Sequence, residues 1–326
     1  MEHRPLGTTG LHVSAIGFGA WAIGGDWGAV PDDDALAALH AAADAGVTFY
    51  DTADVYGDGR SERLLARFRA ERDEDLVIAT KCGRRGPLDP AIYTEEQLRA
   101  WIDRSRENLA TDTVDVVQLH CPPPAVYDDP AVFSALDRLK EQGVIAHYGV
   151  SVETVDEGLR ALQHPGLSVI QVIVNAFRQK PLEQLLPQAA ARGVGIIARV
   201  PLASGLLTGK LTPDATFPPD DHRSFNVRGE AFDVGETFAG VDFQQGLDAV
   251  EELRPLAHQD RTLAQAALRW LLDQPHVSTA IPGAKRPEQA RANAEAASLP
   301  PLTDAEHALI RDVYERRIAP QVAGRW

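Results

Sequence analysis

The sequence predicts an α/β protein, a (β/α)8 TIM barrel with extra helices and a long loop after the seventh strand. Segments with a helical period end in glycine, which supplies the left-handed residue that caps a helix. The apolar runs that follow are short, β-branched and hardly alternate, which is typical of strands buried on both faces. Eight such runs alternate with helices in 326 residues without a linker, so we expect one barrel domain over residues 1–326. A doubly wound sheet is the alternative.

The expected elements follow one another along the chain. Strands are expected over residues 14–19, 47–53, 76–81, 114–120, 144–151, 168–174, 194–200 and 276–282. Alternating helices are expected over 35–45, 94–109, 130–142, 182–192 and 263–272, and two further helices over 244–258 and 304–316. In the helix over 94–109, Thr94 and Gln97 predict a capping box, and the residues that share its apolar face are Leu98, Ile102, Ser105 and Leu109.

Residues 211–241 interrupt this rhythm. They are rich in Pro and Asp and poor in apolar residues. A structureless stretch of this length in a compact domain is usually a functional loop or disordered. Because it follows the seventh strand, we expect it at the mouth of the barrel.

The stretch GFGAWA, residues 17–22, matches a dinucleotide-binding fingerprint, but its context does not. Such a motif must open a helix. Here IGGDWGAVP follows, with further glycines and a proline before any helix. We therefore interpret the stretch as a glycine-rich mouth loop that carries Trp21 and Trp27.

Composition excludes several classes of protein. The net charge of −15 argues against a nucleic-acid partner, which would normally require a basic face. The two cysteines, Cys82 and Cys121, form no CxxC pair and suit a reducing, cytoplasmic location. The N-terminal residues show no apolar signal segment, and no apolar run is long enough for a membrane span. The sequence does not set the oligomeric state.

Polar residues stand at the carboxyl ends of successive expected strands, where the chemistry of a parallel barrel collects. Asp51 ends the second strand and Tyr56 lies in its loop, while Lys81 and His120 end the third and fourth strands. Each could have a purely structural role, as a turn residue, a solvated strand end or a core histidine. A lysine that ends the apolar run LVIAT needs an acid nearby, because a buried unpaired charge is costly. Asp51 is its natural partner.

These four side chains suit proton transfer to a carbonyl oxygen. The phenol of tyrosine has an ordinary pKa near ~10. A lysine cation at roughly 4 Å, at an effective dielectric constant of about 20, contributes on the order of 4 kcal/mol and is expected to lower that pKa toward neutrality. Asp51 would hold Lys81, and His120 could donate a hydrogen bond to a substrate oxygen. The set is therefore suited to protonating a carbonyl while another group delivers hydride.

The chain resembles the aldo-keto reductase superfamily. The blocks that carry the resemblance, in order, are DTADVYG, ATKCG, QLHCPP, YGVS, VPLASGLLTGK and IPGAKRPEQARAN, and the stretch GAWAIGG is similar to its bacterial branch. The resemblance implies a (β/α)8 barrel and NADPH bound without a Rossmann fold. It assigns Tyr56 as general acid, Lys81 and Asp51 as its tuning pair, and His120 as the group that orients the carbonyl.

The resemblance also implies contacts to the cofactor. Ser151 and Gln171 would meet the nicotinamide carboxamide, and Arg199 would stack on its ring. The pyrophosphate would be held by Leu202, Ser204, Leu206 and Lys210. The adenosine 2′-phosphate end would be held by Lys285, Arg286, Gln289 and Asn293, and Trp21 and Gly283 complete the expected set. The chain departs from the family pattern at Val152 and Val174, outside the catalytic four, and at Gly283, where some branches carry a lysine. NADPH is still expected over NADH.

The substrate and the direction of reaction stay open at this stage. We expect the pocket wall to include Trp21, Trp27, Phe177, Trp326 and the 211–241 loop. The leading hypothesis is an enzyme that reduces small aldehydes or ketones, and the second is a sugar or polyol dehydrogenase. A cofactor-sensing, non-catalytic subunit is the third. A metal site at His120 and the two cysteines is not expected, because adjacent strand residues point in opposite directions.

Overall fold

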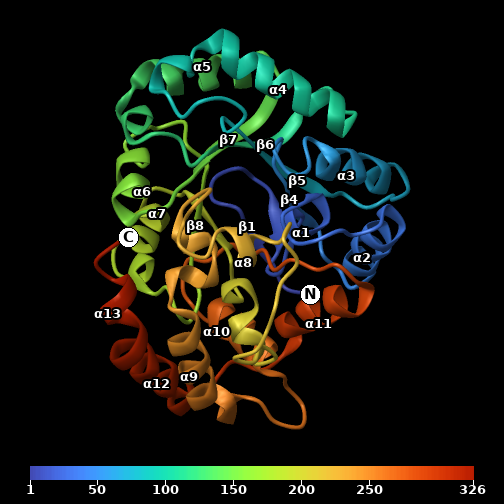
Figure 1. The fold of residues 1–326 in the computed structure, drawn as a ribbon. Coiled ribbons are helices and arrows are strands. Elements are labelled where there is room, and N and C mark those ends of the chain that lie inside the picture. Colours follow the sequence, from blue (N-terminus) through green and yellow to red (C-terminus); the bar gives the residue numbers. More distant parts are fainter.

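The computed structural model describes residues 1–326, and its core is a barrel of eight parallel strands (Figure 1). The strands lie in the order of the chain, and parallel bridges from Ile16 to Ala280 and from Gly19 to Gly283 join the last strand to the first. The eight strands are β3 (Phe18–Gly19), β4 (Phe49–Asp51), β5 (Val77–Cys82), β6 (Val114–His120), β7 (Ile145–Ser151), β8 (Val169–Ile173), β9 (Gly195–Arg199) and β10 (Thr279–Ala280). The predicted barrel is confirmed.

Eight helices alternate with the strands around the barrel, and the sequence predicted all of them except α3, α6 and α11. The alternating helices are α2 (Asp32–Asp44), α3 (Arg60–Ala70), α4 (Glu95–Leu109), α5 (Pro130–Glu141), α6 (Val155–Ala161), α7 (Leu185–Ala191), α10 (Leu263–Leu272) and α11 (Pro287–Glu295). All four residues of the predicted face of α4 are buried. The Thr94 side chain caps that helix by accepting from Gln97 N at 3.3 Å, without the reciprocal half of a capping box. No helix combines the length and the apolar character that a bilayer crossing requires.

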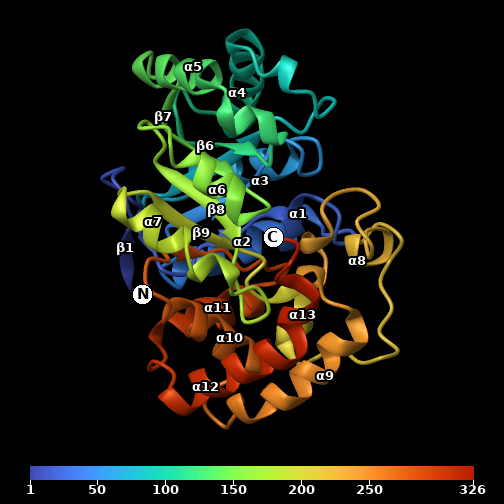
Figure 2. The ribbon, with the colours of Figure 1, turned by 90° about the vertical axis from the view of Figure 1, so that its left-hand side faces the viewer.

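The first barrel strand is shorter than expected. Residues 3–14 instead form an antiparallel hairpin, β1 (His3–Pro5) and β2 (His12–Ser14), at the end of the barrel opposite α8 (His222–Phe225) (Figure 2). The predicted strand over 14–19 is thus correct only for Phe18 and Gly19. A side chain at Gly19 would bring its Cβ to 2.7 Å from Ile281 O, so glycine allows the barrel to close here.

The fingerprint-like stretch GFGAWA includes Gly19, whose role is to let the first and last strands of the barrel approach closely. The only helix that it opens is the four-residue α1 (Trp21–Gly24), which begins within the stretch, and the parallel barrel contains no Rossmann unit at this point. The prediction against a dinucleotide fold is confirmed.

The 211–241 segment is more ordered than expected. It contains α8 and two 3₁₀ turns, η5 (Val234–Glu236) and η6 (Phe238–Gly240), and it lies over the mouth of the barrel (Figures 1 and 2). Its anchors include a bridge between Asp221 and Trp27. The remaining helices, α9 (Phe243–Leu253), α12 (Asp304–Val313) and α13 (Ala319–Val322), pack together beside the barrel, and a π-helical turn (Tyr314–Ile318) joins the last two.

Candidate active site

The predicted catalytic residues meet at the carboxyl end of the barrel. Asp51 ends β4 and Lys81 lies in the neighbouring β5, which places their side chains on the same inner face. Lys81 Nζ lies 2.5 Å from Asp51 Oδ1 and 3.3 Å from the Tyr56 hydroxyl, and it donates to Thr52 O at 2.8 Å. The lysine is almost fully buried, and it joins the aspartate to the tyrosine as the sequence predicted.

Two glutamines complete this arrangement, and the sequence reasoning assigned neither of them to it. Gln118 Nε2 and Gln171 Nε2 donate to Asp51 Oδ2 at 3.0 and 2.7 Å. Gln118 precedes His120 by two residues in β6, so the period of a strand could have placed it on the same face. Gln171 was expected at the nicotinamide carboxamide, whereas here its amide nitrogen binds Asp51. We call Asp51, Tyr56, Lys81, Gln118 and Gln171 the inner network.

The pKa of Tyr56 moves opposite to the prediction. Burial raises it to about 12; Lys81 lowers it, while Asp51 and Glu236 add to the rise. For Lys81 itself, burial lowers the pKa, but Asp51 and Tyr56 outweigh burial and the net shift is upward. The sequence estimate weighed the lysine and left out the burial of the phenol. At neutral pH Tyr56 therefore carries its proton and Lys81 is charged.

His120 is neutral and stands edge-on to the tyrosine. Its ring centroid lies 6.0 Å from that of Tyr56 at an interplanar angle of 87°. Burial, followed by Arg84 and Lys81, holds its pKa well below the ordinary value. Its Nδ1 is buried and has no hydrogen-bond partner in the protein. A neutral imidazole here can donate one hydrogen bond to a bound oxygen.

A cavity of about 260 Å³, which we call the substrate cavity, opens above Tyr56 and His120. Its other walls are Trp21, Asp26, Val55, Arg84, Ala231, Phe232 and Glu236. The ring of Trp21 stacks on Tyr56 at 5.9 Å. The loop that carries Tyr56 packs closely on α1, because a Cβ at Gly24 would lie 2.7 Å from Tyr56 Cβ. The helix α1 thus contacts both the ring and the Cβ of the tyrosine.

A second cavity of about 440 Å³, the cofactor groove, runs from Tyr56 and His120 across the ends of the later strands. It collects most of the expected cofactor residues: Trp21, Ser151, Gln171, Arg199, Leu202, Ser204, Lys210, Gly283, Lys285, Gln289 and Asn293. Leu206 and Arg286 do not line it: Leu206 is fully buried in the core and Arg286 is exposed. The groove also includes Arg223 and Gln265, which the sequence reasoning missed.

Aromatic rings close the mouth beside this groove. His222 of α8 lies 4.7 Å from the ring of Trp21 and 4.5 Å from that of Trp27. The Lys285 ammonium donates to Trp27 O, and the Arg223 guanidinium lies 4.8 Å from the Trp27 ring. Trp27 therefore belongs to the groove and does not reach the substrate cavity.

Two expected pocket residues lie elsewhere. Phe177 has no exposed surface and packs in the core, so it lines neither cavity. Trp326 also lines neither cavity. Its ring lies 3.7 Å from the Arg178 guanidinium, and its Nε1 donates to Asp233 at 3.2 Å. The interpretation of both as pocket walls is corrected. Trp326 instead braces the segment that carries Glu236.

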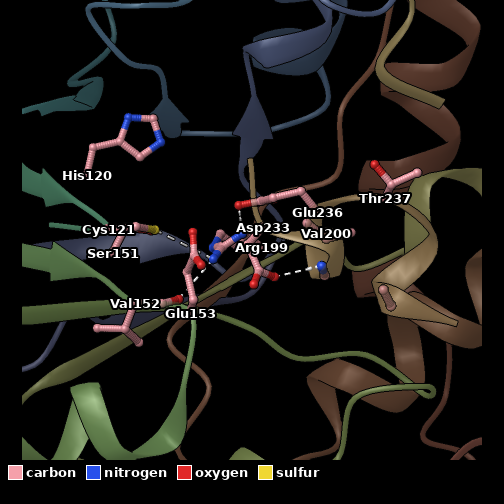
Figure 3. Close-up of polar contacts among 12 residues, drawn as sticks. His120, Cys121, Ser151, Val152, Glu153, Arg199, Val200, Asp233, Glu236 and Thr237 are labelled. Atoms are coloured by element: carbon pink, nitrogen blue, oxygen red, sulfur yellow. Dashed lines mark hydrogen bonds and ion pairs between the residues drawn. The ribbon is translucent and has the colours of Figure 1, made fainter. Parts of the chain in front are cut away.

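Charged side chains, of which Arg199 and Glu236 are buried and the others half-buried, gather at the outer edge of the site (Figure 3). Arg199 forms an ion pair with Glu236 and donates to Val152 O at 2.9 Å, and Arg84 Nη2 lies 2.6 Å from Glu153 Oε1. The stacking of Arg199 on a nicotinamide ring stays a prediction. We call Arg84, Glu153, Arg199, Asp233 and Glu236 the outer charge cluster.

Cys121 also reaches this cluster. It follows the end of β6 with φ of 44°, and its thiol lies 3.5 Å from Ser151 Oγ and 3.8 Å from an Arg199 nitrogen. Its sulfur and the carboxylates of Glu153 and Glu236 lie within 4.8 Å of one another. Arginines already pair with both acids, so this donor set does not suit a cation. Cys121 lines neither cavity, and its contacts are to Ser151 and Arg199 and not to Lys81 or His120.

Asp54 lies in the loop between β4 and α3, close to Asp51 in the sequence. It is fully buried, and neither of its carboxylate oxygens has a hydrogen-bond partner. Burial, with a contribution from Glu62, raises its pKa to about 7. Asp58, in the same stretch, is exposed and pairs with Arg85 and Arg104.

Comparisons with known proteins agree with this architecture. The family model described as "Aldo/keto reductase family" matches residues 15–315. The aldo-keto reductase YhdN of Bacillus subtilis is 31% identical over 90% of this chain and 88% of its own length. The NADH-specific methylglyoxal reductase of Escherichia coli is 30% identical over 97% of this chain and 99% of its own length. The solved glycerol dehydrogenase AKR11B4 of Gluconobacter oxydans has a TM-score of 0.78 and 29% identity, covering 97% of this chain and 96% of that chain. The chain belongs to the aldo/keto reductase family.

Proposed function

We propose that the protein is an NADPH-dependent reductase of aldehydes or ketones in which Tyr56 is the general acid. Its family comprises oxidoreductases that act on carbonyl or alcohol groups with nicotinamide cofactors. The observation that carries the proposal is the buried Lys81 between Asp51 and Tyr56, because Tyr56 borders both the substrate cavity and the cofactor groove. A substrate carbonyl and a cofactor would therefore meet at this phenol.

The protonation states favour donation of a proton. Tyr56, with its pKa raised to about 12, keeps its proton through the physiological range. His120, whose pKa is held well below the ordinary value, is neutral and can orient a carbonyl oxygen through one hydrogen bond. As Tyr56 releases its proton, the nearby Lys81 ammonium would stabilise the phenolate. This is general acid catalysis with a fixed cation beside the acid.

The groove fits the proposed cofactor. NADPH, when bound, supplies the hydride. Ser151 and Gln171 border the inner part of the groove, and Lys210, Arg223 and Lys285 place cations along the rest, which suits phosphate groups. We propose NADPH over NADH because Arg223 and Lys285 both line the groove and both contact Trp27, which brings two cations to one place. Since one relative is NADH-specific, the preference needs a direct test.

A second candidate function is the oxidation of a sugar or polyol with NADP⁺. The similarity to a glycerol dehydrogenase favours it. Oxidation requires Tyr56 to accept a proton from the alcohol, and only the phenolate form can do so. Because the pKa of Tyr56 is raised, little phenolate is present at neutral pH, and we therefore place this direction second. The third hypothesis, a cofactor-sensing non-catalytic subunit, stays a prediction. A cytoplasmic location also stays a prediction; both cysteines are free thiols.

The test compares cofactors and directions with the purified wild type. Oxidation of NADPH and of NADH is measured with 4-nitrobenzaldehyde, and reduction of NADP⁺ is measured with glycerol, all at pH 7. We expect turnover with the aldehyde, a higher kcat/KM for NADPH than for NADH, and slower oxidation of glycerol. Faster oxidation of glycerol would support the second candidate. Cofactor binding without turnover on either substrate would support the third.

A further inference from the structure

Arg84 lines the substrate cavity next to the catalytic residues. It follows β5 by two residues, and its Nε donates to His120 O at 3.1 Å. It borders the same cavity as Tyr56 and His120. Its guanidinium is therefore fixed by the backbone of the strand that carries His120.

One terminal nitrogen of Arg84 is free. Nη2 binds Glu153, Nε binds His120 O, and Nη1 has no hydrogen-bond partner in the protein. That atom is not among the buried unpaired ones, and 18% of the side chain is exposed. A guanidinium with a free edge is suited to binding a carboxylate.

The other charges of the substrate cavity are already engaged. Asp26 Oδ2 accepts from Trp21 Nε1 at 3.2 Å, and Glu236 is paired with Arg199. Arg84 is the one cation among the residues that line this cavity. An anionic group that entered would thus find one positive partner.

Glu153 is a weak counter-ion for Arg84. Burial and the nearby Asp233 raise its pKa to about 7, although Arg84 lowers it. Figure 3 shows Glu153, Asp233 and Glu236 gathered around Arg199, so carboxylates crowd one another here. Protonation of Glu153 near neutral pH removes its charge and frees Arg84 for another anion.

We propose that Arg84 is a specificity-determining residue that binds the carboxylate of aldehyde or ketone substrates, with their carbonyl at Tyr56 and His120. This rests on the proposed reductase function. The remaining walls, Trp21, Val55, Ala231 and Phe232, suit an apolar spacer between the two polar ends. The substrate class is therefore a small oxo-acid with an aromatic or aliphatic spacer.

The test uses two aldehydes of the same shape, 4-carboxybenzaldehyde and its neutral analogue 4-formylbenzamide. The wild type should prefer the carboxylate in kcat/KM. Arg84→Gln should lower kcat/KM for the carboxylate by about 10- to 100-fold, the size of a charge-assisted hydrogen bond, and by less than about threefold for the amide. Arg84→Lys should keep part of the preference.

The matched control is Arg85→Gln. Arg85 is the next residue, pairs with Asp58 at 2.5 Å and lines neither cavity, so its loss should leave the preference unchanged. Equal losses on both aldehydes in Arg84→Gln, or a wild-type preference for the amide, would overturn the inference.

Binding measured without turnover separates this inference from the proposed function. Calorimetry with benzoate and benzamide should show tighter binding of benzoate to the wild type, and loss of that difference in Arg84→Gln. If neither aldehyde is reduced but the binding of benzoate still depends on Arg84, the reductase proposal fails and the anion site stands. If benzoate binds no better than benzamide, the anion site fails whatever the activity.

Discussion

The inner network and the outer charge cluster hold buried carboxylates in different ways. Asp51 is saturated: Lys81 binds one oxygen, and Gln118 and Gln171 bind the other. In the outer charge cluster Glu153 pairs with Arg84 and Glu236 pairs with Arg199, while Asp233 accepts only from Trp326 and Gly235, and the pKa of Glu153 rises to about 7. The first arrangement surrounds one carboxylate with three donors of fixed position and suits catalysis. In the second arrangement Glu153 can lose or gain its charge near neutral pH, which suits the binding and release of an anionic ligand at Arg84.

The two regions also differ in what positions them. The inner network is borne mainly by strands β4, β5, β6 and β8, whose register is set by backbone pairing. The outer charge cluster draws on the segments that follow β5 and β7, on the last residue of β9, and on the 211–241 segment. Its geometry depends on supports such as the contact of Trp326 with Asp233. Substitutions in the inner network should therefore have the larger effects.

The largest effect is expected for Lys81→Met. It leaves the Asp51 carboxylate buried without a cation and removes the charge beside Tyr56. We expect reduction of 4-nitrobenzaldehyde to fall by about 10²- to 10⁴-fold and the free energy of unfolding to fall by about 3–5 kcal/mol. Activity assays and urea unfolding measure the two. Lys140→Met, on the exposed face of α5, is the control and should change neither.

Asp54 is the extreme case, a buried carboxylate with no partner. Its folded pKa of about 7 exceeds the unfolded value, so it favours the folded state at low pH, and this stability is lost as the pH rises to 7. Asp54→Asn should therefore gain up to about 4 kcal/mol of unfolding free energy relative to wild type between pH 4 and pH 8. Urea unfolding at both values measures the change. Parallel pH profiles would show that Asp54 is not titrating in this range.

A smaller effect is expected for Glu153→Gln, which removes the exchangeable charge of the outer charge cluster. The charged groups near Glu153 are Arg84, Arg178, Arg199, Asp233 and Glu236, with the Cys121 thiol beside them. In the wild type, affinity for benzoate should fall by about tenfold for each pH unit above 7, as Glu153 ionises. The variant should bind benzoate equally from pH 6 to pH 8. A wild type without pH dependence would show that Glu153 does not compete.

The sequence predicted the barrel and the meeting of Asp51, Lys81 and His120 because both follow from the strand pattern, whereas Tyr56 was placed by its loop and by the family resemblance. Asp51, Lys81 and His120 lie at or next to the carboxyl ends of their strands, and parallel strands bring such ends together. The outer charge cluster could not be predicted this way, since Arg84, Glu153 and Glu236 come from loops with no periodic signal. The predicted shift in the pKa of Tyr56 had the wrong direction, because burial is a property of the folded protein that a single sequence segment does not reveal.

Tyr56→Phe tests the central claim, that Tyr56 donates the proton in carbonyl reduction. The variant removes one hydroxyl and keeps the ring that stacks on Trp21. Oxidation of NADPH with 4-nitrobenzaldehyde should fall by about 10²- to 10⁴-fold in kcat, while NADPH affinity, measured by fluorescence titration, stays within about threefold of wild type. Equal kcat values in wild type and Tyr56→Phe would contradict the account.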